Sequence, residues 1–258
     1  MTSTYTNYQL VTRDLPRSID NVKRQPDVAR ETEYYLANIS KVKTIEDFVK
    51  DRRLLNYAMK AHGLGDMSYA KALMVKVLKG GRDDTSSFAH RLADPRYLDF
   101  AETFDFARHG ALATTFGKAQ QGTVDKFVRQ TLEENAGDGN EGVRLSLYFQ
   151  RKAPALTSVT EILADRAVAT VVRTALGLPE STAFLDIDKQ VEMIGKKVDI
   201  KDFADPAKLS KFIKRFTALW DVSNSSVDQA TGVGLLFTQS AASSVSSNLM
   251  LAIQNLRR

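Results

Sequence analysis

The sequence contains no cysteine among its 258 residues. That absence excludes disulfide bonds, zinc sites built from thiolates and catalysis by a thiol. It also leaves the compartment open, because no cysteine pairing reports the redox state of the protein's surroundings.

Long apolar runs are missing as well. No window of the chain approaches the roughly 18 apolar residues that a membrane-spanning helix needs. The opening residues, MTSTYTNYQLVTRDLPRSID, carry no apolar segment behind a basic start, so we expect no Sec signal peptide. We interpret residues 1–25 as a polar arm whose terminus frays, with an unstructured type III export signal as the alternative.

Charge of one sign is not concentrated anywhere in the chain. Lys and Arg number 36 against 31 Asp and Glu, so the net charge is +5, and no long basic block occurs. This balance favours weak attraction to polyanions over a dedicated binding site for them. Apolar residues make up 43% and charged residues 26%, which is typical of a globular protein.

Runs of alternating β-branched residues bounded by turns are also scarce, which favours an all-α fold. What the sequence does contain is one helix signal in two copies. KDRRLLNYAMKAHGLGD, residues 50–66, has a fainter echo in ADRAVATVVRTALGLPE, residues 164–180.

Both copies carry the same start and stop signals. Each has a hydroxyl followed three residues later by a carboxylate, then an aspartate that can cap a second helix, and finally a Gly-Leu stop. These signals begin at Thr44, Asp51 and Gly63 in the first copy and at Ser158, Asp165 and Gly177 in the second. Further on, Asp94-Pro95 and Asp205-Pro206 each favour another helix start. The pattern favours an internal duplication, and the alternative is that unrelated helical hairpins share their caps.

The predicted architecture is a multi-helix bundle built from two similar helical units joined by a helical hairpin, with a C-terminal amphipathic helix. Its parts are a polar N-terminal arm over 1–25, helical unit 1 over 26–106, a linking helical hairpin over 107–157, helical unit 2 over 158–221, and a flexible linker with the C-terminal amphipathic helix over 222–258.

The C-terminal segment supplies the candidate interaction face. Val245, Leu249, Ile253 and Leu256 fall on one face of a helix. That apolar stripe must be buried either on the chain's own body or on a partner.

Short motifs do not reveal a cofactor site or a catalytic site. GDGNEG, residues 137–142, matches G-x-G-x-x-G, but a dinucleotide fingerprint requires a preceding strand and a helix is predicted there. His62, His90 and His109 lie far apart in sequence and fit no metal-binding frame, so we interpret them as surface or helix-capping residues. We therefore predict no catalytic, cofactor-binding or metal-binding residue.

One predicted helix has a basic face. Lys208, Lys211, Lys214 and Arg215 lie opposite its apolar residues. A solvated face is the favoured interpretation, and contact with nucleic-acid phosphates is the alternative.

Four long segments resemble a known family. They are DLPRSIDNVKRQPDVARETEYYLANISKVKTIEDFVKDRRLLNYAMKAHGL, LADPRYLDFAETFDF, NEGVRLSLYFQRKAPAL and DPAKLSKFIKRFTALWD. They are similar to the alphaproteobacterial family called domain of unknown function 1217, and the resemblance covers roughly residues 10 to 222. It implies repeated helical units, no established activity or catalytic residues, and genes that lie near flagellar genes.

From these observations we expect a non-enzymatic, flagellum-associated structural or assembly protein that acts through helical protein–protein contacts. Its partner would be another protein, a flagellar component among the candidates, or a second copy of itself. Its localisation would be cytoplasmic or flagellum-associated. The alternatives are a hydrolase or transferase with a site assembled between the two halves, and, least favoured, a nucleic-acid-binding protein.

Overall fold

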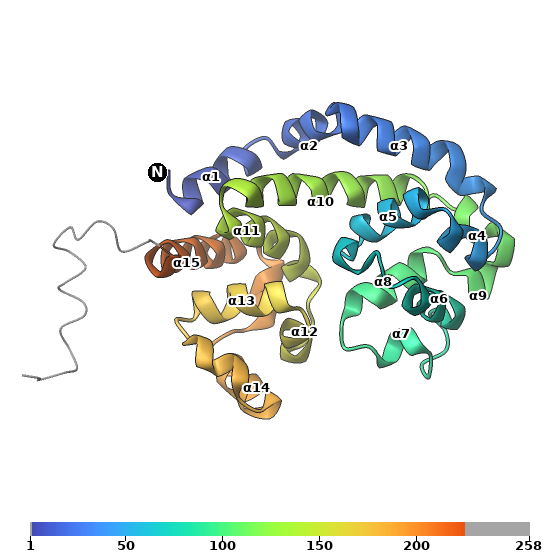
Figure 1. Cartoon of the computed structure of the whole chain (residues 1–258). Coiled ribbons are helices and arrows are strands. Elements are labelled where there is room, and N and C mark those ends of the chain that lie inside the picture. Colours follow the sequence, from blue (N-terminus) through green and yellow to red (C-terminus); the bar gives the residue numbers. More distant parts are fainter. Residues whose placement is uncertain (1, 225–258) are drawn as a thin grey trace, which may run out of the picture. The chain divides into compact units, whose positions relative to one another are not determined.

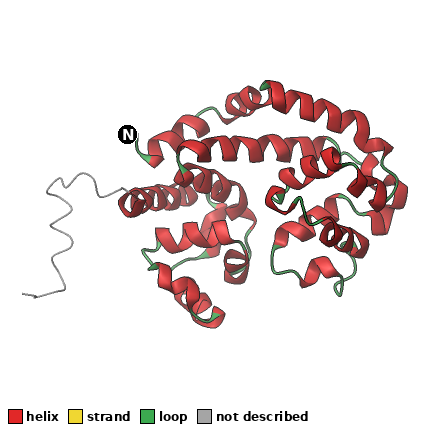
Figure 2. Ribbon diagram, viewed as in Figure 1, coloured by secondary structure: helices red, strands yellow, loops and turns green. Residues whose placement is uncertain are grey.

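The computed structural model describes residues 2–224, which fold into helices joined by loops and turns (Figure 2). They form fifteen α-helices and six 3-10 helices, with no strand in this range. The prediction of an all-α fold is therefore confirmed. None of these helices has both the length and the hydropathy needed to cross a lipid bilayer. The predicted C-terminal stripe of Val245, Leu249, Ile253 and Leu256 lies outside the described residues.

The N-terminal segment is folded, whereas its polar sequence led us to expect an arm that frays. It forms helices α1 (Thr4–Thr12) and α2 (Leu15–Lys23). Tyr8 of α1 and Val22 of α2 are buried. The backbone N–H of Thr4 also donates to the carboxylate of Asp221 over 3.1 Å. The sequence pattern concealed this because each short helix buries few side chains on an otherwise polar surface.

A first hydrophobic core gathers apolar side chains from Val22 to Leu132. Its centre is aromatic: the ring of Tyr57 stacks on Tyr35 and on Phe127, with centroids 4.4 Å and 3.8 Å apart. Its helices are α3 (Pro26–Asn38), α4 (Ile45–Lys50), α5 (Arg52–Ala61), α6 (Lys71–Gly80), α7 (Phe88–Arg91), α8 (Pro95–Thr103), α9 (Phe106–His109) and α10 (Gln121–Gly139), with the 3-10 helices η1 (Ile39–Lys41), η2 (Gly65–Met67) and η3 (Gly110–Thr115).

The predicted caps set the ends of α4 and α5. Thr44 accepts from the N–H of Asp47, whose carboxylate accepts from the N–H of Thr44, so the capping box is complete. Asp51 accepts from the first N–H groups of α5. Gly63 ends that helix with a φ of +71°, a conformation that costs glycine little.

A second hydrophobic core gathers apolar side chains from Val143 to Phe216, together with Tyr8. The side chains on one face of its central helix, from Val168 to Ala175, are buried, as the apolar spacing predicted. Its helices are α11 (Glu141–Lys152), α12 (Val159–Ala164), α13 (Arg166–Ala175), α14 (Ile187–Gly195) and α15 (Pro206–Asn224), with the 3-10 helices η4 (Ala153–Ala155), η5 (Glu180–Phe184) and η6 (Ile200–Ala204).

The second set of predicted caps is also present. Ser158 accepts from the N–H of Glu161, and Asp165 caps α13. The carboxylate of Glu161 turns back to the N–H of Thr157 instead of that of Ser158, so the box is displaced by one residue. Gly177 ends α13 with a φ of +64°.

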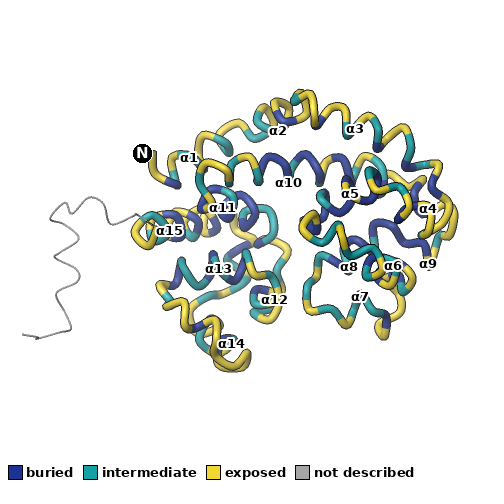
Figure 3. Tube along the Cα trace, viewed as in Figure 1, coloured by how far each residue is buried: buried dark blue, intermediate teal, exposed yellow. Residues whose placement is uncertain are grey.

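Helices α10 and α11 are integral to the two cores. Val124, Phe127 and Leu132 of α10 are buried in the first core, whereas Val143 and Phe149 of α11 are buried in the second. Residues 107–157, which the sequence suggested were a linking hairpin, thus contribute to both interiors. Figure 1 shows α10 beside α5 and α11, and Figure 3 shows the buried residues along these helices.

Candidate functional site

Charged side chains gather where α10 meets α11, between the two apolar cores. Glu133 is only 1% exposed and lies between two arginines. Its carboxylate accepts from Nε of Arg129 over 3.0 Å and from Nε and Nη2 of Arg151 over 2.8 Å each. A carboxylate this deeply buried is stable only because two guanidinium groups satisfy it. The ion pairs of Glu133 therefore link the last turns of α10 to the end of α11.

A second cluster joins α5, α8 and α10. His62 is the C-cap residue of α5, and its Nδ1 lies 2.8 Å from Oδ2 of Asp99 on α8. Lys126 of α10 donates to both carboxylate oxygens of Asp99 over 2.8 Å. His62, Asp99 and Lys126 thus form one hydrogen-bonded group from three helices.

The environment of this group sets its protonation. Burial lowers the pKa of His62, and the hydrogen bond that its ring donates to Asp99 only partly opposes that effect. Burial would raise the pKa of Asp99, but its bonds to His62 and Lys126 outweigh burial and hold that pKa well below its usual range. Nε2 of His62 is buried without a hydrogen bond, and the ring lies against Phe100 and Phe104. This nitrogen is therefore enclosed within the fold.

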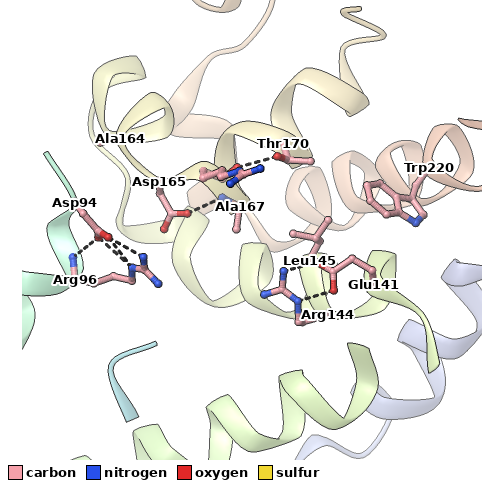
Figure 4. A pocket seen from close by; sticks show the side chains of 11 residues that line it. Asp94, Arg96, Glu141, Arg144, Leu145, Ala164, Asp165, Ala167, Thr170 and Trp220 are labelled. Carbon is pink, nitrogen blue, oxygen red and sulfur yellow. Dashed lines mark hydrogen bonds and ion pairs between the residues drawn. The ribbon is translucent and has the colours of Figure 1, made fainter. Parts of the chain in front are cut away.

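A pocket of about 460 Å³ is lined by residues outside these two clusters. Arg96 comes from α8, Arg144 and Leu145 from α11, and Trp220 from α15. Asp94, Glu141 and the junction of α12 and α13 form the rest of the lining. Figure 4 shows Arg96 on one side and Trp220 on the other, with Arg144 between them. The pocket therefore draws residues from helices of both cores.

The charges around this pocket are partly paired. Arg96 donates from Nε and Nη2 to Asp94, and from Nη1 to the carbonyl of Gly63. Arg144 donates to Glu141. Asp165 caps α13 and accepts from the hydroxyl of Tyr148 over 2.6 Å. The pocket is thus lined by carboxylates whose oxygens are engaged and by guanidinium groups held in place.

The three histidines are not brought together. His62 is the C-cap residue of its helix, one of the two roles expected for it, and it is buried with only its Nδ1 bonded, to Asp99. His90 is half-buried, with Nδ1 3.0 Å from the hydroxyl of Ser87, and the ring of His109 lies against Phe116. None of the three lines the pocket. In residues 2–224 no group of three or more His, Asp or Glu side chains is arranged to hold a metal ion.

The glycine motif of residues 137–142 joins two helices, and the helix predicted before it is confirmed. Gly142 lies directly under Trp220, where a Cβ would collide with the indole ring. The motif therefore allows close packing of α11 against α15.

The basic face of α15 is solvent-exposed, as the favoured interpretation required. Lys208, Lys211, Lys214 and Arg215 are all exposed. Lys208 donates to Asp202 over 2.5 Å, and Lys214 lies over the ring of Tyr5. Two of its four cations therefore have partners within the chain.

Sequence reasoning missed Asp99, Lys126 and Glu133. Glu133 and Glu134 are adjacent on a helix and point apart, which does not reveal that Glu133 is buried. The available signal was the spacing of Arg129 and Glu133, four residues apart on one helix. Asp99 gave no local signal, because its partners lie 37 and 27 residues away.

The family of the chain is shown by its match to a family profile. The profile described as "Protein of unknown function (DUF1217)" matches residues 61–209, from the last residue of α5 into α15. The chain belongs to this family. The resemblance noted in the sequence is thereby confirmed.

A solved structure shares this fold. Protein AGR_C_984 from Agrobacterium tumefaciens, determined by X-ray crystallography, matches with a TM-score of 0.80 and 49% sequence identity. The match covers 87% of this chain and 97% of that chain. No curated protein matches the chain.

Proposed function

We propose that this chain is a non-enzymatic structural or assembly protein that acts through helical protein–protein contacts. Its partner is another protein or a second copy of the chain. The flagellar setting in this proposal comes from the gene neighbourhood that the family resemblance implies. The surface of the second core, described below, is the structural observation that carries the proposal.

We further propose that the chain contains two similar helical units. Helices α4 and α12 begin at residues 45 and 159, which are 114 residues apart, and both have six residues. Helices α5 and α13 begin at residues 52 and 166, again 114 apart, and both have ten residues. The equal spacing of the two helix pairs and their equal lengths support duplication of one pair of helices. Repetition of such a pair is typical of proteins that present extended helical surfaces.

The two halves differ in what covers the helix that follows the glycine stop. In the first half, α6 packs against α7, α8 and α9. In the second half, the chain passes from α14 through η6 to α15 without comparable helices.

Three large apolar side chains near the start of α14 are exposed as a result. Phe184 is 89% exposed, Ile187 is 65% exposed and Leu185 is 40% exposed. Contiguous exposed apolar side chains favour a protein contact, because water contact with them is costly. This exposed apolar group carries the proposal. The sequence stripe from Val245 to Leu256 supports it as a second candidate face.

Light scattering after size-exclusion chromatography tests the proposal. The samples are the full chain, a chain lacking residues 240–258, and the double variant Phe184→Ser/Ile187→Ser. We expect the full chain to self-associate or to retain a protein partner from the native cell. We expect truncation or the double substitution to abolish that contact while circular dichroism stays nearly unchanged.

The control is Leu112→Ser, which removes a side chain that is 61% exposed on η3 and should leave the contact intact. A full chain that stays monomeric and retains no partner contradicts the proposal. Loss of helical content on truncation would show that the removed residues belong to the core.

A further inference from the structure

The pocket beside α13 has more free donors than free acceptors. Asp94 and Glu141 are each paired with an arginine of the same wall, and Asp165 accepts two backbone N–H groups and the hydroxyl of Tyr148. Every carboxylate that lines the pocket is thus engaged. A ligand that entered would meet few unsatisfied acceptors.

The donors are used less completely. Arg166, at the start of α13, is exposed, and its guanidinium makes no hydrogen bond or ion pair with any residue between 2 and 224. Arg144 uses Nε and Nη2 for Glu141, which leaves its Nη1. Guanidinium groups bind carboxylate and phosphate oxygens with well-defined geometry. The remaining hydrogen-bonding capacity of the pocket therefore suits an anion.

The side opposite Arg96 has apolar surface from the indole ring of Trp220 and the side chain of Leu145, next to the Glu141–Arg144 pair (Figure 4). The indole is held at one position because it packs on Gly142 and against the ring of Phe216, with centroids 5.6 Å apart. A rigid aromatic surface beside arginine donors can receive a flat apolar group. The volume of about 460 Å³ falls in the range of small-molecule sites.

We propose that this pocket binds a small organic anion, namely a carboxylate or phosphate monoester attached to a flat apolar group. Arg166 and Arg144 hold the anionic group, and Trp220 contacts the flat part. Arg96 is a structural member of the wall, because Asp94 and the carbonyl of Gly63 already take its donors. This site goes beyond the proposed protein contacts and does not depend on them.

Nuclear magnetic resonance of the full chain tests the proposal directly. Trp220 is the only tryptophan in the sequence, so its Nε1–H gives one indole signal. The probes are phenyl phosphate and benzoate, with benzyl alcohol as the neutral control. We expect a saturable shift of the indole signal with one or both anions and none with benzyl alcohol. A shift with phenyl phosphate alone identifies the phosphate ester as the ligand class, and a shift with benzoate alone identifies the carboxylate.

Variants assign the anion to Arg166. Arg166→Gln should raise the dissociation constant about tenfold, the loss expected for one charge-assisted hydrogen bond. Arg166→Lys should lose less, because the charge remains. Arg215→Gln removes the same charge from an exposed position outside the pocket and should leave binding unchanged. Arg166 is exposed, so circular dichroism should show its variants folded.

Three results overturn the proposal. The first is the absence of a saturable shift with both anions. The second is an equal shift with benzyl alcohol. The third is an equal loss of affinity in Arg166→Gln and Arg215→Gln, which would reduce the effect to net charge.

Discussion

The segment from α3 to Gly63 and the segment from α11 to Gly177 use the same polar contacts. Tyr34 donates to Asp51 over 2.9 Å in the first, and Tyr148 donates to Asp165 over 2.6 Å in the second. Each aspartate also caps the helix that follows it. Each of these helices ends at a glycine with positive φ.

The apolar side chains inside the two segments differ. Phe48 of α4 has the place that Ile162 has in α12, and Tyr57 of α5 has the place of Val171 in α13. At these two matched positions the first segment therefore has an aromatic ring where the second has an aliphatic side chain. Short-range hydrogen bonds therefore maintain the backbone path, while the interior can be filled by side chains of different volume.

Removing the matched core residues should give the largest effects. Phe48 and Ile162 are both fully buried. Phe48→Ala should lower the free energy of unfolding by about 3–5 kcal/mol, and Ile162→Ala by about 2–4 kcal/mol, because the larger ring leaves the larger cavity. Urea unfolding followed by circular dichroism measures both. A greater loss of unfolding free energy in Ile162→Ala than in Phe48→Ala would contradict the difference between these two matched positions.

Glu133 lies where α10 meets α11. Removing its side chain tests whether its ion pairs with Arg129 and Arg151 stabilise the packing of these two helices. Glu133→Ala should cost about 3 kcal/mol, because Arg129 and Arg151 then lose the carboxylate that satisfies them in a buried place. Glu134→Ala is the matched control on the next residue. The side chain of Glu134 is 41% exposed and pairs with Lys60, so we expect a loss of less than about 1 kcal/mol.

An equal loss of unfolding free energy in Glu133→Ala and Glu134→Ala would show that the buried Glu133 cluster contributes no more to stability than an exposed ion pair. Urea unfolding measures this pair as well.

Of the residues that cap α5 and α13 at their C-terminal ends, only the one on α5 can bind a proton, which gives a smaller, pH-dependent effect. His62 caps α5, whereas Leu176 caps α13. Burial lowers the pKa of His62 below its ordinary value of 6.5. The unfolded chain therefore binds a proton that the folded chain does not, so this contribution to stability is complete above about pH 6.5 and falls as the pH decreases below it.

Urea midpoints between about pH 7 and pH 5 measure this effect. We expect the midpoint of the wild-type chain to decline over that range and the decline to be largely removed in His62→Leu. His109→Gln is the control and should retain the decline. The low pKa of Asp99 places its own acid loss at lower pH, outside this window. An unchanged decline in His62→Leu would rule out His62 as its source.

How much could be predicted from the sequence depends on the range of each interaction. Thr44, Asp51 and Gly63 act on backbone groups within a few residues, so their spacing predicted the ends of α4 and α5. The packing of the linking helical hairpin predicted over residues 107–157 depends instead on contacts between residues far apart in the chain. An apolar stripe shows that α10 is buried without showing which core it joins.

The candidate site could not be predicted from the sequence either, because its residues are far apart in the chain. Arg96 and Trp220 are far apart in the chain, and only tertiary packing brings them to one pocket. Glu133 and Arg151 are 18 residues apart on two helices, so no helical spacing links them. A polar residue in a sequence is normally read as exposed, and nothing local marks Glu133 as an exception.

Asp51 and Asp165 make the same polar contacts in the two segments. The most direct test of this similarity is the free energy of unfolding of Asp51→Ala and of Asp165→Ala, both measured by urea unfolding. Each substitution removes a cap from a ten-residue helix and the acceptor of a tyrosine hydroxyl. We predict losses of about 1–2 kcal/mol for each, equal to within about 0.5 kcal/mol. A clear loss in one variant with none in the other would contradict the account.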